Sequence, residues 1–209
     1  MECAEGLKRL LGEFGISSES YGARQLLGYL ELLEKWNARI NLTAAREWAA
    51  LEPLFREGIW ASRLYPVEAH THLDIGSGAG FPAIPLQILV PGVRMEMVES
   101  RAKRSAFLET VIHALGMESC VHTERLDRFL SHCQGGGIWD CISWKGVKLL
   151  TRDVFELRLH AHPQTQFWIF HGRELAVEEP EAFESSFEPL WSKKLPGRKQ
   201  WSLSAFLKR

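Results

Sequence analysis

The sequence predicts an α/β fold, in which a mostly parallel, twisted sheet with an antiparallel edge follows an N-terminal helical segment. Two patterns support this prediction: residues 1–65 show helical periodicity, and beyond residue 66 short apolar strands alternate with helices. A glycine-rich turn, residues 76–80, also follows the first strand directly. The 209 residues, of which 45% are hydrophobic and 24% charged, suit one domain with a small appendage.

The N-terminal segment, residues 1–65, is expected to form three helices. The first has apolar residues on one face and ends near Gly15, and a serine at position 17 or 18 is a candidate N-cap for the second. The third is expected from about residue 48 to residue 64, because the residue before Pro66 disfavours helix. We therefore divide the chain into a helical segment, 1–65, and an α/β domain, 66–209.

The α/β domain is expected to begin with four strands separated by three helices. The strands are expected at residues 71–75, 94–99, 120–123 and 138–143, and the helices near residues 82–89, 103–115 and 126–132. This order implies a largely parallel sheet with helices on both faces. Two late strands, at residues 165–170 and 201–207, are expected to provide the antiparallel edge.

Charge and cysteine content exclude several classes of protein. There are 25 Lys and Arg residues against 26 Asp and Glu, so the net charge of −1 gives no sign of a dedicated nucleic-acid binder. The four cysteines form no CxxC pair and are interpreted as free thiols in a reducing compartment. The acidic N-terminus lacks a signal-peptide pattern and no stretch is apolar enough to span a membrane, so we expect a cytoplasmic protein.

The turn Gly76-Ser77-Gly78-Ala79-Gly80 is the most informative stretch. Glycines at alternate positions let the backbone bend tightly and approach a ligand where a Cβ would collide. In a parallel sheet the turn lies at the carboxyl end of a strand, where such folds bind ligands. Glu99 lies 23 residues after Gly76, at the end of the second strand, where a carboxylate accepts both hydroxyls of a ribose. The alternative is a purely structural turn with a solvated glutamate.

Glycine spacing alone leaves the nucleotide-like ligand open. Gly78-x-Gly80-x-x-Ala83 also satisfies a loose dinucleotide pattern, so NAD remains an alternative. Asp74, just before the turn, would repel a pyrophosphate and favours a ligand that carries positive charge. S-adenosylmethionine has a sulfonium and an ammonium group and no phosphate, and it is the cofactor we favour.

Three segments resemble one known family. They are the runs Asp74 to Pro85 (DIGSGAGFPAIP) and Trp36 to Thr43 (WNARINLT), and Val98-Glu99-Ser100 followed by Lys103-Arg104-x-x-Phe107-Leu108. In this order they resemble the RsmG (GidB) family of guanine-N7 methyltransferases of small-subunit (16S) ribosomal RNA. The resemblance implies a Rossmann-like class I S-adenosylmethionine methyltransferase fold. It also implies small-subunit ribosomal RNA or the 30S subunit as partner, and a monomer.

The resemblance also implies site residues. Gly76 and Phe81 would contact the cofactor, and Leu126 with Asp127 would lie beside its adenine; for Asp127 alone, a helix N-terminal acid is an equal interpretation. Lys145 stands where the family has an arginine near the cofactor. The proposed cofactor-binding set is therefore Asp74, Gly76, Gly78, Gly80, Phe81, Glu99, Leu126, Asp127 and Lys145.

The sequence also departs from the family pattern. The family's H-x-x-D-S segment reads here Gly58-Ile59-Trp60-Ala61-Ser62, and Ala83 replaces a glycine of the cofactor loop. An alternative function is therefore a catalytically weakened relative that binds RNA or ribosomal subunits without methylating. A methyltransferase with a different substrate is another.

No catalytic residue and no metal site are predicted. Guanine N7 has an available lone pair, so transfer to it needs positioning rather than a general base. The pairs His70-x-His72 and His160-x-His162 have no evident third ligand and are expected to be solvated.

Two basic patches are candidates for contact with RNA. The first lies near the C-terminus beside Trp191 and Trp201, and its alternative interpretation is an exposed edge strand; it consists of Lys193, Lys194, Arg198, Lys199, Lys208 and Arg209. The second consists of Arg101, Lys103 and Arg104, and its alternative interpretation is an exposed helix start.

Overall fold

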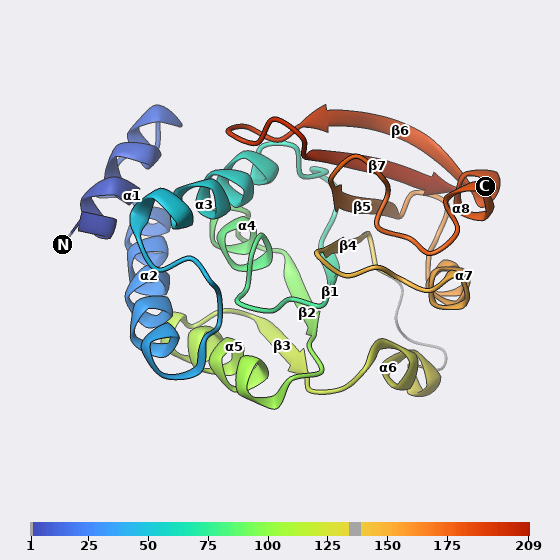
Figure 1. The fold of residues 1–209 in the computed structure, drawn as a ribbon, viewed down its shortest axis with the longest axis horizontal. Coiled ribbons are helices and arrows are strands. Elements are labelled where there is room, and N and C mark those ends of the chain that lie inside the picture. Colours follow the sequence, from blue (N-terminus) through green and yellow to red (C-terminus); the bar gives the residue numbers. More distant parts are fainter. Residues whose placement is uncertain (1, 134–138) are drawn as a thin grey trace.

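A computed structural model describes residues 2–133 and 139–209. One seven-stranded sheet forms the centre, in the order β3-β2-β1-β4-β5-β7-β6. Helices cover both of its faces (Figure 1). Among the described residues, no helix combines the length and the apolar character that crossing a bilayer would require.

The N-terminal segment forms the three expected helices, α1 (Glu2–Glu13), α2 (Tyr21–Ile40) and α3 (Trp48–Ser62). The N-cap of α2 is Ser20, whose Oγ accepts a hydrogen bond from the backbone N–H of Ala23 at 3.2 Å. The prediction of a cap at residue 17 or 18 was therefore wrong, because the chain makes a further turn before the helix begins.

Five strands run parallel: β1 (Thr71–Ile75), β2 (Arg94–Val98), β3 (Ser119–His122), β4 (Cys141–Lys145) and β5 (Gln166–His171). Part of the expected strand at 138–143 lies outside the described residues. The strand expected at 165–170 is β5. It belongs to the parallel set through β4 and pairs antiparallel with the strand expected at 201–207, so the two late strands do meet at the antiparallel edge. That edge is a hairpin of β6 (Phe187–Lys194) and β7 (Ser202–Lys208), in which β7 pairs with both β5 and β6.

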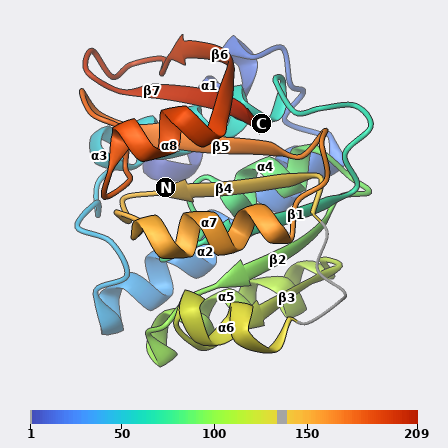
Figure 2. The same cartoon turned by 90° about the vertical axis from the view of Figure 1, so that its right-hand side faces the viewer.

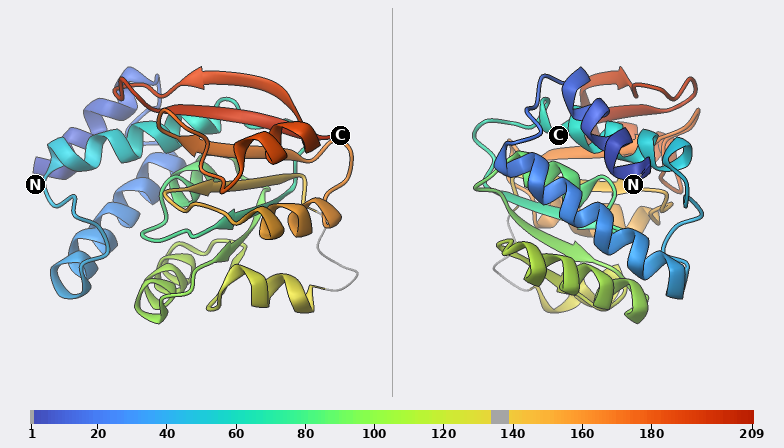
Figure 3. Two further views of the ribbon diagram at one scale, coloured as in Figure 1. Left: turned by 45° about the vertical axis from the view of Figure 1, so that its right-hand side comes forward. Right: turned by 90° about the vertical axis from the view of Figure 1, so that its left-hand side faces the viewer.

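The connecting helices divide between the two faces. Helices α4 (Ala83–Leu89) and α5 (Ala102–Leu115) lie with the N-terminal helices on one face (Figure 3). Helices α6 (Leu126–His132), α7 (Thr151–Leu159) and α8 (Pro180–Ser186) cover the other (Figure 2). This arrangement follows from the right-handed crossovers of a parallel sheet.

Two hydrophobic clusters fill the space between sheet and helices. In the first, Leu26, Tyr29 and Phe55 from the N-terminal helices pack with Met95 and Met97 of β2. The second contains aromatic residues such as Phe129 and Trp139 on the opposite face. The N-terminal helices therefore share a core with the sheet, and the division at residue 65 stays a prediction.

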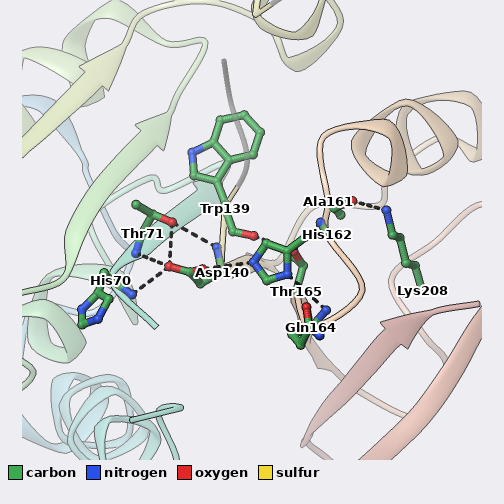
Figure 4. Close-up of polar contacts among 9 residues, drawn as sticks. All are labelled: His70, Thr71, Trp139, Asp140, Ala161, His162, Gln164, Thr165 and Lys208. Carbon is green, nitrogen blue, oxygen red and sulfur yellow. Dashed lines mark hydrogen bonds and ion pairs between the residues drawn. The ribbon is translucent and has the colours of Figure 1, made fainter. Parts of the chain in front are cut away.

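Asp140, just before β4, ties three segments together at the amino ends of the strands (Figure 4). Its Oδ2 accepts hydrogen bonds from the backbone N–H groups of His70 and Thr71, at 2.8 and 2.9 Å, and from Thr71 Oγ1 at 2.9 Å. Its Oδ1 lies 3.1 Å from Nε2 of His162. Burial alone would raise the pKa of Asp140, but these hydrogen bonds more than offset it and lower the pKa to about 2.

We expect Asp140→Asn to destabilise the fold by about 1–3 kcal/mol near neutral pH, because the amide replaces a charged acceptor. Since the folded pKa is depressed, this stabilisation exists above the unfolded pKa and is lost as pH falls through the folded value. The difference in unfolding free energy between wild type and variant should therefore shrink from about pH 7 to about pH 3 in urea titrations. Glu188→Gln, at an exposed position of β6, is the control; an equal difference at both pH values would contradict the prediction.

Candidate functional site

The glycine turn after β1 has the backbone conformation that its sequence predicts. Gly76 and Gly78 have φ values of +70° and +58°, which side-chain-bearing residues rarely adopt. A Cβ on Gly76 would lie 2.3 Å from Cγ2 of Val147, whereas a Cβ on Gly78 would meet nothing closer than 3.7 Å. Gly78 is itself buried, and its positive φ rather than a close neighbour is what requires glycine there.

Gly80 faces the core. A Cβ there would lie 2.6 Å from Cγ1 of Ile84 and 3.2 Å from the hydroxyl of Tyr29. That hydroxyl donates a hydrogen bond to the carbonyl of Ala79 at 2.5 Å. Tyr29 belongs to α2, so the N-terminal segment holds the turn directly.

Glu99 follows β2, and its carboxylate binds the backbone of the glycine turn. Its Oε2 accepts a hydrogen bond from the N–H of Gly78 at 2.9 Å, and its Oε1 accepts one from the N–H of Arg101 at 2.8 Å. Although the side chain is buried, it lines the cavity described next. Two backbone donors therefore fix a carboxylate at the cavity wall in one orientation.

A cavity of about 620 Å³ opens at the carboxyl ends of β1, β2 and β4. The start of α6 and the loop after β4 complete its walls. Seven of the nine predicted site residues line it: Gly76, Gly78, Phe81, Glu99, Leu126, Asp127 and Lys145. Gly80 and Asp74 are not among the lining residues. The structure thus brings together residues that are widely separated along the chain.

Asp74 lies in a buried hydrogen-bonded chain between β1 and β4. Ser143 Oγ donates to Asp74 Oδ1 at 2.6 Å and lies 2.8 Å from Nε2 of His72, whose Nδ1 lies 3.2 Å from the hydroxyl of Tyr65. Burial raises the pKa of Asp74 and lowers the pKa of His72 to about 3. The expectation that His72 is solvated was wrong: its ring is 1% exposed and serves as a neutral link in this chain.

Phe81 lines the cavity from the far end of the turn. Its ring packs against Tyr29 and Phe55, with centroid separations of 5.3 and 5.0 Å. Both partners come from the N-terminal helices. The aromatic contact therefore sets the position of the turn relative to α2 and α3.

Lys145, at the end of β4, makes an ion pair with Glu57 of α3. The Glu57 side chain is fully buried, and it also pairs with Arg198 from the loop between β6 and β7. Burial lowers the pKa of Lys145, and the charge of Glu57 acts in the opposite direction. Sequence analysis did not find Glu57 or its link to Arg198. A glutamate inside an apolar helix was the available signal, because a fully buried carboxylate needs a charged partner.

The two predicted basic patches differ in accessibility. In the C-terminal patch, Arg198 points toward Glu57 and Lys208 donates to the carbonyl of Ala161, which leaves Lys193, Lys194, Lys199 and Arg209 exposed. Arg101 and Arg104 of the second patch line the cavity, together with Arg125 and Lys148, which were not predicted. Of the two tryptophans, Trp201 lines the cavity and Trp191 packs on Trp168.

Sequence comparison places these features in a known family. A family model described as GidB, rRNA small subunit methyltransferase G, matches residues 23–188. A ribosomal RNA small subunit methyltransferase G from Yersinia pestis is 32% identical over 168 residues, 79% of each chain. The protein of the same name from Salmonella arizonae is 36% identical over 114 residues, so that alignment spans 54%, about half, of each chain.

Solved structures share the fold. An O-methyltransferase from Bacillus cereus in complex with SAH has a TM-score of 0.59 at 16% identity, with 87% of this chain and 91% of that chain covered. A putative O-methyltransferase from Klebsiella pneumoniae has a TM-score of 0.61 at 14% identity, with 87% and 90% covered. The expected class I methyltransferase fold is confirmed. Because the GidB model matches most of the chain, the protein belongs to the family of rRNA small subunit methyltransferase G.

Proposed function

We propose that the protein transfers a methyl group from S-adenosylmethionine to N7 of a guanine in small-subunit (16S) ribosomal RNA. One observation carries the proposal: the cavity at the carboxyl ends of β1, β2 and β4 has in its wall the carboxylate of Glu99, which the N–H of Gly78 holds in place. A carboxylate in this place of a doubly wound sheet binds ribose hydroxyls.

The residues around the cavity fit S-adenosylmethionine. Gly78 lines the cavity without a side chain to fill it, and Glu99 is the acceptor for the ribose. Leu126 and Asp127, at the start of α6, would flank the adenine, and Gly76 and Phe81 would contact the ligand from the turn. Asp74 and Gly80 would support this site from the core, as their burial indicates.

The chemistry asks little of the protein beyond positioning. When bound, the cofactor supplies an activated methyl group on a positively charged sulfur. The N7 lone pair is available without deprotonation, so the chain must hold the guanine in line, about 3 Å from the methyl carbon. Lys145 places an ammonium at the cavity wall, where we propose that it contacts the cofactor region as the family's arginine does.

The rim of the cavity supports an RNA substrate. Arg101, Arg125 and Lys148 are exposed there, and such side chains contact backbone phosphates. We propose the 30S subunit as the form in which the RNA is recognised, with the enzyme acting as a monomer. Since ribosomal subunits occupy the cytoplasm, we propose that location for the enzyme.

Two measurements test the proposed function. Isothermal titration calorimetry should give saturable micromolar binding of S-adenosylmethionine and no binding of NAD. Small subunits from a strain that lacks the corresponding methylation should then gain one N7-methylguanine, identified by mass spectrometry of a nuclease digest. Binding of subunits that weakens steeply with salt would support RNA recognition. Cofactor binding without turnover would instead support a catalytically weakened relative, which the family comparison does not favour.

We expect Glu99→Gln to reduce the affinity for S-adenosylmethionine by about 10- to 100-fold, since a charged acceptor for two hydroxyls is lost. Calorimetry of the variant measures this directly. The matched control is Glu109→Gln, at an exposed position of α5 outside the cavity, which should bind as wild type. Unchanged affinity in Glu99→Gln would exclude a ribose-binding role.

We expect Glu57→Gln to lower the free energy of unfolding by about 3–5 kcal/mol, because two cations lose their partner. Adding Lys145→Met to this variant should recover part of the loss by removing one of the stranded charges. Urea titration measures both effects.

The control for this experiment is Glu52→Gln, which removes a carboxylate from the same helix. Glu52 pairs with Arg56 at 2.6 Å but is 35% exposed, so its loss should cost less than about 1 kcal/mol. If Glu52→Gln and Glu57→Gln lower the free energy of unfolding equally, the prediction that the buried carboxylate contributes more to stability than the exposed one is wrong.

A further inference from the structure

Three metal-ligating side chains gather on the edge of the sheet, outside the cavity. Cys120 and His122 lie two residues apart on β3, so they project from the same face. Glu96 on β2 pairs in register with Cys120 and therefore shares that face. Met95 and Met97, its neighbours, point into the opposite core, which confirms the alternation.

The donor atoms of these residues converge on one point. Nε2 of His122 lies 3.0 Å from Oε2 of Glu96 and 3.5 Å from Sγ of Cys120. All three donor atoms lie within 4.8 Å of one another. For Zn²⁺ with bonds of about 2.3 Å to sulfur and about 2.0–2.1 Å to nitrogen and oxygen, tetrahedral angles require S···N of about 3.5 Å and N···O of about 3.3 Å. The observed separations of 3.5 Å (S···N) and 3.0 Å (N···O) are close to these required separations.

We propose that Glu96, Cys120 and His122 bind a divalent transition-metal ion, with Zn²⁺ as the ion that fits best. A thiolate, an imidazole and a carboxylate form a donor set that suits Zn²⁺ and discriminates against Mg²⁺ and Ca²⁺, which prefer oxygen ligands. The thiolate and carboxylate balance the charge of the ion. Three protein ligands leave a fourth position for water.

Neighbouring side chains hold two of the three proposed ligands, Glu96 and His122, in fixed orientations. Trp139 Nε1 donates to Oε1 of Glu96 at 3.2 Å, which leaves Oε2 to face His122. The ring of His122 packs on Phe129 of α6, with centroids 4.5 Å apart, so its orientation is restrained. Such contacts orient ligands in metal sites. Cys120 is exposed and gives the ion a route of entry.

The site would brace the sheet edge and is independent of the methyltransferase proposal. None of its three residues lines the cavity. A bound ion would join β2 to the edge strand β3, beside the helix that follows it. Because an ion that binds the folded state stabilises it, thermal stability should rise with free metal concentration. An ordinary His122–Glu96 ion pair beside a free thiol is the competing interpretation, and it predicts no such dependence.

Titration with Co²⁺, a spectroscopic substitute for Zn²⁺, tests the proposal on the 209-residue chain. We expect one equivalent to give a thiolate-to-cobalt charge-transfer band with tetrahedral d–d absorption, and Zn²⁺ to displace it. Cys120→Ser should abolish the charge-transfer band and weaken Zn²⁺ binding at least 10-fold. Because position 120 is exposed, this variant should fold normally, which circular dichroism and metal-free melting would confirm.

Two matched controls keep the test specific. His132→Ala removes a histidine that pairs with a different carboxylate, that of Glu124, at 2.9 Å. Cys133→Ser removes a second free thiol, at the end of α6. Both should bind Co²⁺ as wild type does. Absence of the charge-transfer band in the wild type would overturn the proposal. So would a Cys120→Ser variant that binds Zn²⁺ with unchanged affinity, or a control that loses binding as Cys120→Ser does.

Discussion

The buried carboxylate of Glu57 is the constraint on which the arrangement around the cavity depends. It joins the N-terminal helices to the end of β4 through Lys145, and to the C-terminal hairpin through Arg198. Arg198 in turn lies over the ring of Trp201, 5.4 Å from its centroid, and Trp201 lines the cavity. A carboxylate removed from water is stable only while its partners stay in place. Three distant parts of the chain are therefore held around one site.

The same helix gives a physical account of one departure from the family pattern. A Cβ on Gly58 would lie 2.7 Å from Cβ of Pro85 and 3.1 Å from the carbonyl oxygen of Pro82. Helices α3 and α4 therefore approach more closely than a larger residue at position 58 would allow. A histidine there, as in the family pattern, would require the two helices to separate. Gly58 thus allows α3, the helix that also carries Glu57, to pack closely on α4.

The glycine turn and Glu99 could be predicted because local sequence determines them. Alternate glycines after a strand specify the turn, and the acid ends the next strand of a parallel pair. The link from Glu57 to Lys145 could not, since these residues are 88 positions apart and only the folded chain brings them together. Strand β6 was missed because Pro189 and the exposed residues on both sides of it obscure the alternation expected of a strand. The Glu96, Cys120 and His122 cluster was missed because it depends on strand register.

Asp74 shows how the folded structure can give a predicted site residue a structural role that the sequence does not reveal. Its position at the end of β1 predicted contact with a cationic ligand, and the structure places its carboxylate in the core, where Ser143 Oγ donates to it. Ser143 is on β4, so this hydrogen bond joins the two strands whose ends open the cavity. Burial raises the pKa of Asp74, while the charge of Lys145 acts in the opposite direction. The ammonium that Glu57 holds at the cavity wall therefore also favours the ionised form of Asp74, which links the buried carboxylates of α3 and β1 through one lysine.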